Sequence, residues 1–205
     1  MILEDLARVR VLPVIEIDDA TRAADLATAL SLGGVPCAEV TLRTPAAPAA
    51  IEEMSRRGDF LVGAGTVLRA EQVDIAADRG AQFVVSPGFV PSVALRAHDR
   101  GVAYIPGVGT ATEVLNALAA GFAVQKLFPA EQLGGADFVK AMRGPFPDVS
   151  FIPSGGLTPH NASSYDLPTV HALSTSWIAS RAAIAAGKFS AIAERAQLLR
   201  DCVNA

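Results

Sequence analysis

The segment of residues 80–128 reads GAQFVVSPGFVPSVALRAHDRGVAYIPGVGTATEVLNALAAGFAVQKLF. Within it a glycine followed by an apolar run occurs at Gly80, Gly101 and Gly121, and segments with the apolar spacing of helices lie between the runs. A glycine that ends a helix directly before a buried strand is typical of a strand–helix repeat. The segment therefore predicts consecutive strands that pair in parallel, with helices as their connections.

The same alternation extends along the chain in both directions. The expected strands are 11–17, 35–42, 60–65, 82–86, 102–105, 122–128, 149–153 and 169–174. The expected helices are 19–32, 46–57, 70–79, 91–100, 111–120, 135–143, 159–165 and a C-terminal helix at 189–203. The strand segments are nearly continuous apolar runs, which indicates burial on both faces, as in a parallel sheet covered by helices. This pattern predicts an α/β protein, a single (β/α)8 TIM-barrel domain over residues 1–205.

A doubly wound open sheet is the alternative fold. Such a sheet usually has fewer strands, and its dinucleotide-binding members carry Gly-x-Gly-x-x-Gly after the first strand. Here the first expected strand is followed by Asp18 and Asp19, and Gly107-Val-Gly109 lacks the third glycine. The barrel is therefore the preferred prediction.

Composition excludes several classes of protein. The 205 residues are 51% apolar with a net charge of −4, which does not suit a nucleic-acid-coating protein. No run approaches the ~20 apolar residues of a membrane span, and the N-terminus lacks a signal-peptide pattern. Cys37 and Cys202 lie far apart, and the three histidines lack zinc-site spacing. We expect a cytoplasmic protein with no nucleic-acid partner, no membrane contact, no metal and no cofactor.

Lys126 is the most informative residue of the chain. It is one of only three lysines and lies inside the apolar run FAVQKLF (122–128). Lys140 lies in an expected amphipathic helix, and Lys188 follows a glycine just before the last expected helix. Burial disfavours the charged form of an amine, and a neutral amine can attack a carbonyl carbon. The alternatives are a lysine that reaches water from a strand end, or a structural ion pair.

A second candidate group lies on the strand CAEVTLR (37–43). A period of two places Glu39 and Arg43 on one face, which would point into the barrel. Arg43 lies toward the carboxyl end of the strand, where barrel active sites form, and a guanidinium can bind a substrate carboxylate through two hydrogen bonds. Glu39 could transfer protons. A buried structural salt bridge is the alternative.

Other candidates follow the third, seventh and eighth expected strands. Thr66 would offer a hydroxyl at the barrel mouth, or cap a helix. Gly155 and Gly156 could bind an anion through their backbone N–H groups, or simply make a turn. The loops after the seventh and eighth strands commonly form the phosphate site of barrels.

Several conspicuous residues are predicted to be structural. Trp177, the only tryptophan, is predicted to pack rather than to recognise a ligand. The three histidines are predicted to be surface or satisfied core residues. Glu16 is a candidate carboxylate at the mouth, for which a solvated strand end is the preferred interpretation.

Taken together, these segments resemble the family of 2-keto-3-deoxy-6-phosphogluconate (KDPG) and 4-hydroxy-2-oxoglutarate aldolases. The matching segments are EVTLRT (39–44), VGAGTV (62–67), SPG (86–88), IPG (105–107), KLFPAE (126–131), GPF (144–146) and PSGG (153–156). They extend over nearly the whole chain, and together they are far more specific than any one of them.

The resemblance implies a homotrimeric (β/α)8 barrel and a class I aldolase that needs no metal and acts on a small 2-keto acid. It places the Schiff-base lysine on Lys126, the general acid–base on Glu39, the carboxylate-binding arginine on Arg43 and the threonine that contacts the pyruvyl group on Thr66. The remaining substrate-binding residues would be the pocket-wall Phe128, the hydroxyl of Ser154, and a phosphate site made of Gly155, Gly156 and Ser176.

One departure from the family concerns the phosphate. The family usually has two glycines before the phosphate-site serine, where this chain has Ser174 and Thr175. Their side chains would reshape the phosphate site, and Glu16 would add negative charge if it points inward. Aldolase activity on an unphosphorylated 4-hydroxy-2-keto acid therefore stays open. So do a phosphate-binding barrel isomerase or epimerase, and a barrel that binds a metabolite without turnover.

Overall fold

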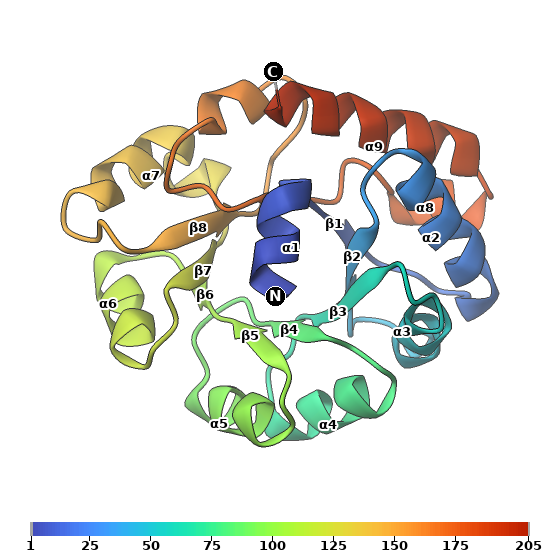
Figure 1. The fold of residues 1–205 in the computed structure, drawn as a ribbon, viewed down its shortest axis with the longest axis horizontal. Helices are drawn as coiled ribbons and strands as arrows, with labels where there is room; N and C mark the ends of the chain where they lie inside the picture. Colours follow the sequence, from blue (N-terminus) through green and yellow to red (C-terminus); the bar gives the residue numbers. More distant parts are fainter. Residues whose placement is uncertain (1, 205) are drawn as a thin grey trace.

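The computed structural model describes residues 2–204 (Figure 1). Its strands are β1 Val11–Ile15, β2 Cys37–Thr41, β3 Leu61–Gly65, β4 Phe83–Val85, β5 Ala103–Ile105, β6 Gly107–Val108, β7 Val124–Leu127, β8 Ser150–Pro153 and β9 Leu173–Thr175. Its α-helices are α1 Ile2–Val9, α2 Ala23–Leu32, α3 Ala47–Ser55, α4 Ala70–Asp78, α5 Pro91–Asp99, α6 Ala111–Ala119, α7 Gly135–Arg143, α8 Arg181–Ala185 and α9 Phe189–Val203. Three 3-10 helices complete the order: η1 Ala20–Arg22, η2 Glu131–Leu133 and η3 Ala162–Tyr165.

The strands form two parallel sheets. One has six strands in the order β5-β4-β3-β2-β1-β9, and the other has the order β6-β7-β8. Isolated parallel bridges, Phe151 to Val170 and Ser154 to Ser174, connect β8 with the segment of β9. Figure 1 shows the strands around a common centre with most helices outside them and α1 across one end. This arrangement confirms the α/β fold with parallel strands.

The expected strands all occur. The first seven are shortened at one or both ends, whereas the last, expected at 169–174, begins later and ends one residue later, as β9 at Leu173–Thr175. The additional strand β6 arises because Pro106 interrupts the chain directly after β5. Proline has no N–H to continue the ladder. Its carbonyl accepts a hydrogen bond from the backbone N–H of Lys126 at 2.8 Å, and β6 then pairs with β7 instead of β4. Pro106 thus marks the change from one sheet to the other.

The helices at 135–143 and 189–203 occur with the predicted bounds. The prediction of an α-helix at 159–165 was wrong, since only η3 forms there. The side chain of Asn161 accepts from the Thr158 N–H at 2.9 Å and donates to the Gly156 carbonyl at 3.1 Å. Such side-chain bonds compete with helical ones. Helix α1 was not predicted, and its Leu6 is fully buried.

The strands lie in the buried interior of the protein. Every residue of β2, β4 and β9 is buried, as the continuous apolar runs predicted. Because α1 directly precedes β1, it lies at the amino-terminal end of the strands, and their carboxyl ends remain available for a site. Within residues 2–204, the structure has no helix of the length and apolarity that a bilayer crossing requires.

Candidate active site

Lys126 and Glu39 form a buried ion pair between β7 and β2. The Lys126 Nζ lies 2.9 Å from Oε1 and 3.1 Å from Oε2 of Glu39. The lysine side chain is 9% exposed and the glutamate side chain 1% exposed, so each charge is stabilised by its partner rather than by water. The expected co-location of these two residues is therefore present, and the ion pair is also the structural alternative that the sequence left open.

A glycine makes room for the carboxylate of Glu39. Strand β3 pairs with β2, and a Cβ atom added to Gly65 would lie 2.2 Å from Glu39 Oε1. No side chain at position 65 is compatible with that contact. Gly65 thus leaves space for the Glu39 carboxylate, whereas Gly63 leaves space for the ring of Phe83.

This ion pair can generate a nucleophile by proton transfer from the lysine to the glutamate. A lysine ammonium group that donates to a carboxylate can pass its proton to that carboxylate, which leaves a neutral amine able to attack a carbonyl carbon. Glu39 then holds the proton within hydrogen-bonding distance of the reaction centre. This arrangement suits amine catalysis with an adjacent general acid–base.

Arg43 follows β2 and lies at the mouth, with its side chain 51% exposed. Its Nε donates to Thr66 Oγ1 at 3.2 Å. Thr66 has a φ of +58°, a left-handed conformation that costs an L residue about 1–2 kcal/mol. The helix-cap interpretation of Thr66 is wrong, because α4 begins at Ala70 with Arg69 as its N-cap. Strain of this kind persists where the surroundings impose it, often at functional sites.

The loop after β8 carries two glycines in left-handed conformations. Gly155 has a φ of +102° and Gly156 a φ of +83°. A Cβ atom at Gly156 would lie 2.7 Å from Glu131 Cγ, so this position also has no space for a side chain. The Glu131 N–H donates to the Gly155 carbonyl at 3.2 Å, which fixes the loop against η2.

The two residues that depart from the family differ in their effects. The Thr175 hydroxyl donates to the Leu157 carbonyl at 2.7 Å and accepts from the Trp177 N–H at 3.0 Å. The hydroxyl therefore connects the loops after β8 and β9, and the backbone N–H of Trp177 is already used in a hydrogen bond to it. The Ser174 Oγ is buried and has no hydrogen-bond partner within the described chain. Of these two residues, Thr175 is therefore the one that alters the hydrogen-bond donors of the expected phosphate site.

These residues surround a cavity of about 430 Å³. Its lining includes the predicted residues Glu39, Arg43, Lys126, Phe128, Ser154, Gly155, Gly156 and Ser176. Thr66 is not among the lining residues, but its hydroxyl accepts a hydrogen bond from Arg43, which is. Lys126 Nζ lies 5.8 Å from the centre of the Phe128 ring. Thr175, which was expected to reshape the phosphate site, also lines the cavity, and so does Trp177, which was predicted only to pack. The sequence did not point to three further lining residues: Val14, Leu157 and Thr158.

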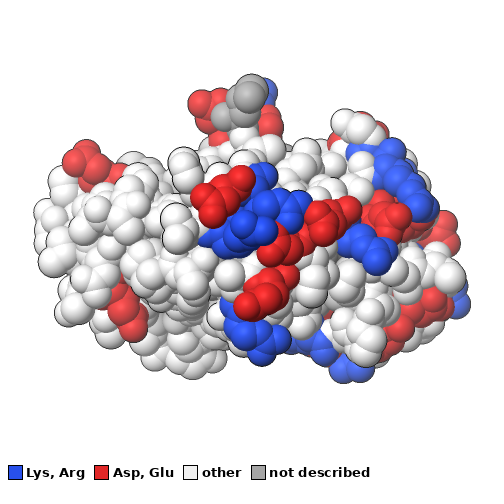
Figure 2. Space-filling model, turned by 90° about the horizontal axis from the view of Figure 1, so that it is seen from below, with Lys and Arg blue, Asp and Glu red and all other residues white. Residues whose placement is uncertain are grey.

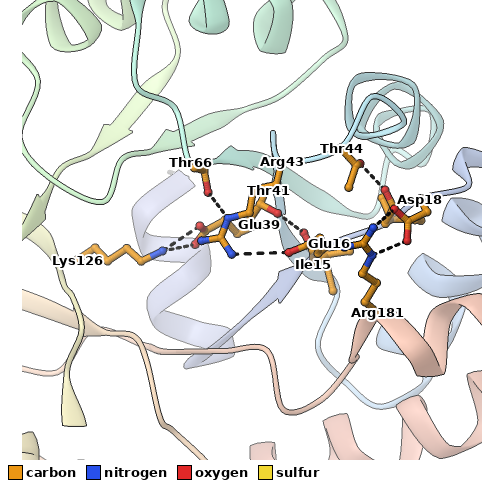
Figure 3. Close-up of polar contacts among 11 residues, drawn as sticks. Ile15, Glu16, Asp18, Glu39, Thr41, Arg43, Thr44, Thr66, Lys126 and Arg181 are labelled. Atoms are coloured by element: carbon orange, nitrogen blue, oxygen red, sulfur yellow. Dashed lines mark hydrogen bonds and ion pairs between the residues drawn. The ribbon is translucent and has the colours of Figure 1, made fainter. Parts of the chain in front are cut away.

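Glu16 directly follows β1 with its side chain 30% exposed, and it is ion-paired at this strand end. Its carboxylate lies between two arginines, with Oε1 2.7 Å from a terminal nitrogen of Arg181 and Oε2 3.7 Å from one of Arg43 (Figure 3). Arg181 also donates to both carboxylate oxygens of Asp18, at 2.5 and 2.6 Å. These hydrogen bonds lower the pKa of Asp18 below its ordinary value. Arg181 and Asp18 carried no signal in the sequence.

Within residues 2–204, no group of three or more histidine, cysteine, aspartate or glutamate side chains is placed to hold a metal ion. The functional groups that face the cavity are an amine, a carboxylate, a guanidinium and hydroxyls. They can bind an oxyacid and exchange protons with it.

The strain at Thr66 predicts an order of stabilities among its variants. Thr66→Ala and Thr66→Gly both lose the hydroxyl that accepts from Arg43. Only glycine adopts the left-handed conformation freely, so we expect Thr66→Gly to have the higher free energy of unfolding, by about 1 kcal/mol. Urea denaturation of the two variants measures this difference. Equal stabilities, or a more stable alanine variant, would contradict the assignment of strain.

The chain is similar to known proteins in sequence and in structure. The chain matches the family model "KDPG and KHG aldolase" over residues 2–195. It is 45% identical over 198 residues to the 2-dehydro-3-deoxy-phosphogluconate aldolase of Treponema pallidum, covering 96% of this chain and 94% of the relative. It is 37% identical to the KHG/KDPG aldolase of Escherichia coli K12, covering 91% and 89% of the two chains.

A solved structure agrees with these relatives. The KDPG aldolase of Legionella pneumophila, with pyruvate captured at low pH as a covalent carbinolamine intermediate, has a TM-score of 0.92 and 36% identity to this chain. The match covers 97% of this chain and 98% of the other. The chain belongs to the KDPG and KHG aldolase family.

Proposed function

We propose that the protein is a class I aldolase, a lyase that cleaves KDPG or a related 4-hydroxy-2-keto acid to pyruvate and an aldehyde. For KDPG the aldehyde is glyceraldehyde 3-phosphate. The observation that carries this proposal is the contact of the buried Lys126 amine with both carboxylate oxygens of Glu39, at 2.9 and 3.1 Å, in the cavity that Arg43 also lines. The carbinolamine in the Legionella relative supports it, because a carbinolamine is what an amine forms when it adds to a carbonyl.

The reaction begins with proton transfer from the Lys126 ammonium group to the Glu39 carboxylate. The neutral amine adds to the C2 carbonyl of the keto acid and forms a carbinolamine. The carbinolamine takes up the proton held by Glu39 and loses water to give a protonated imine. Arg43 binds the substrate carboxylate, and Thr66 orients the guanidinium through its 3.2 Å hydrogen bond. Phe128 and Ser154 line the cavity that holds the amine.

The protonated imine then accepts the electrons of the C3–C4 bond. A base removes the proton of the C4 hydroxyl, the bond breaks, and an aldehyde leaves while an enamine remains on Lys126. Glu39, alone or through a water molecule, carries the proton away and returns one to C3. Hydrolysis of the resulting imine releases pyruvate and restores the amine. The sequence of steps uses no metal or organic cofactor.

The distal part of the substrate would lie at the loops after β8 and β9. Gly155, Gly156 and Ser176 are the residues proposed to hold a phosphate there, through backbone N–H groups and a hydroxyl. Thr175 supports the alternative, an aldolase for an unphosphorylated substrate such as 4-hydroxy-2-oxoglutarate. Its hydroxyl already accepts from the Trp177 N–H at 3.0 Å and so removes one donor from an incoming anion.

We further propose that the two sheets make one closed (β/α)8 barrel in a single domain. The bridges from β8 to the segment of β9, and the passage of the chain through Pro106 from β5 to β6, support closure. A cytoplasmic homotrimer is the assembly proposed. Exposed apolar side chains, Leu95 on α5 and Leu115 on α6, support association, as does the left part of the face seen in Figure 2, which carries few charged side chains.

Borohydride trapping tests the proposed chemistry directly. Incubation with pyruvate and sodium borohydride should reduce the imine and leave a stable adduct on Lys126, located by peptide mass spectrometry. Lys140 and Lys188 are internal controls. Lys126→Arg keeps a cation beside Glu39 but should give no adduct. An adduct on Lys140 or Lys188 alone, or none at all, would overturn the proposal, and a phosphate-binding isomerase or epimerase would give none.

Glu39 is expected to be needed for turnover more than for folding. Glu39→Gln keeps the size and two polar atoms of the side chain but cannot accept a proton. We expect kcat to fall by roughly 10²- to 10⁴-fold, as for the loss of a general acid–base. Steady-state cleavage kinetics measure the loss, and circular dichroism checks the fold. A kcat within a few-fold of the natural protein would contradict the role.

Thr175→Gly tests which substrate the site prefers. The variant should release the Trp177 N–H and lower the KM for KDPG by about tenfold, the effect of one hydrogen bond to a charged group. The KM for 4-hydroxy-2-oxoglutarate should stay unchanged. Ser174→Gly is the matched control, because the Ser174 hydroxyl makes no hydrogen bond within residues 2–204. No gain for KDPG would mean that Thr175 does not limit phosphate binding.

A further inference from the structure

We propose that Glu16 is a positioning residue that competes with the substrate carboxylate for Arg43, and that Arg181 sets the strength of this competition. The proposal rests on the proposed function in one respect, the assignment of Arg43 as the carboxylate-binding group. It concerns residues to which the aldolase mechanism gives no role.

The first observation is a line of alternating charges across the mouth. Figure 3 shows Lys126 and Glu39 at one end, Arg43 and Glu16 next, and Arg181 with Asp18 at the other end. Arg43 is the cation through which the inner pair and the outer cluster approach each other. A change in the outer cluster therefore acts on the site through Arg43.

The second observation is the division of the Glu16 carboxylate between two cations. Oε1 lies 2.7 Å from Arg181, a hydrogen-bond distance, whereas Oε2 lies 3.7 Å from Arg43, an ion-pair distance without a hydrogen bond. Arg181 therefore holds Glu16 more tightly than Arg43 does. If Arg181 were absent, the carboxylate would have Arg43 as its remaining cation among the partners that the structure gives it.

The third observation is that the backbone fixes this arrangement. The Thr41 hydroxyl donates to the Ile15 carbonyl at 2.9 Å, and the Thr44 hydroxyl donates to the Ile17 carbonyl at 2.5 Å. These bonds join the residues on both sides of Glu16 to the residues around Arg43. Both threonines are buried, so the end of β1 and the end of β2 are held together without help from the charges.

A substrate carboxylate on Arg43 would lie close to the carboxylate of Glu16. The Nε of Arg43 is already bound to Thr66, which leaves its terminal nitrogens for the substrate, and Glu16 faces one of these. Two carboxylates at one guanidinium repel each other. For partly exposed charges the effect is up to about fivefold in affinity. Glu16 therefore weakens the binding of every 2-keto acid, whatever its distal group.

Paired variants test this competition. We expect Glu16→Gln to lower the KM for a 4-hydroxy-2-keto acid by about three- to fivefold with kcat unchanged. Arg181→Gln should raise the KM by a similar factor, because Glu16 then turns to Arg43. The double variant should resemble Glu16→Gln, since without the carboxylate Arg181 has nothing to restrain. Calorimetry with pyruvate measures the same affinities independently of turnover.

Three controls separate competition from a general electrostatic effect. Glu53→Gln removes the same charge from an exposed ion pair on α3 and should leave the KM unchanged. A neutral ketone without a carboxylate should be trapped equally well by the natural protein and Glu16→Gln. Added salt should shrink the difference in KM, because the mouth charges are partly exposed.

A KM that rises in Glu16→Gln would overturn the proposal and show that Glu16 merely supports Arg43. An effect of Arg181→Gln that persists in the Glu16→Gln background would also overturn it, because Arg181 would then act by its own charge. Absence of trapping and cleavage in the natural protein would instead refute the proposed function. The calorimetric comparison would still decide whether Glu16 opposes carboxylate binding.

Discussion

The contact between the Lys126 amine and the Glu39 carboxylate is the constraint on which the site depends. Each group is nearly removed from water, and an unpaired charge at either position would cost several kcal/mol. The neighbouring strand accommodates the pair, since Gly65 leaves the space that the carboxylate fills. Removal of one partner therefore affects both chemistry and stability, which is why an isosteric change at Glu39 is more informative than a truncation.

Much of this site was predictable because it lies on strands. The apolar run around Lys126 marked a buried amine, and the period of two in CAEVTLR placed Glu39 on an inward face. The helix at 159–165 was wrong for a local reason. The Asn161 side chain binds the backbone of Thr158 and Gly156, and hydrophobic spacing does not reveal that competition.

The contacts that the sequence could not predict join loops that are distant in the chain. Arg181 follows β9, yet it binds Asp18 and Glu16 after β1. The Thr175 hydroxyl bridges Leu157 and Trp177 because a side chain replaces a glycine of the family, and its direction depends on the fold. The left-handed conformation of Thr66 could not be predicted from the sequence, because a β-branched residue rarely adopts it. The alternation of residues along a strand predicts which side chains share a face of the sheet, whereas contacts between loops depend on the tertiary structure.

The charges at the mouth determine which cation an incoming acid meets. Lys126 has a carboxylate at 2.9 Å and Arg181 has carboxylates at 2.5 to 2.7 Å, whereas the carboxylate nearest Arg43 lies at 3.7 Å. Arg43 is therefore the least neutralised of the three, and it is also more than half exposed on its side chain. A substrate carboxylate would find its strongest unmet attraction there, at the entrance of the cavity that holds Lys126. The same imbalance that makes Arg43 available also makes it the group whose affinity Glu16 can adjust.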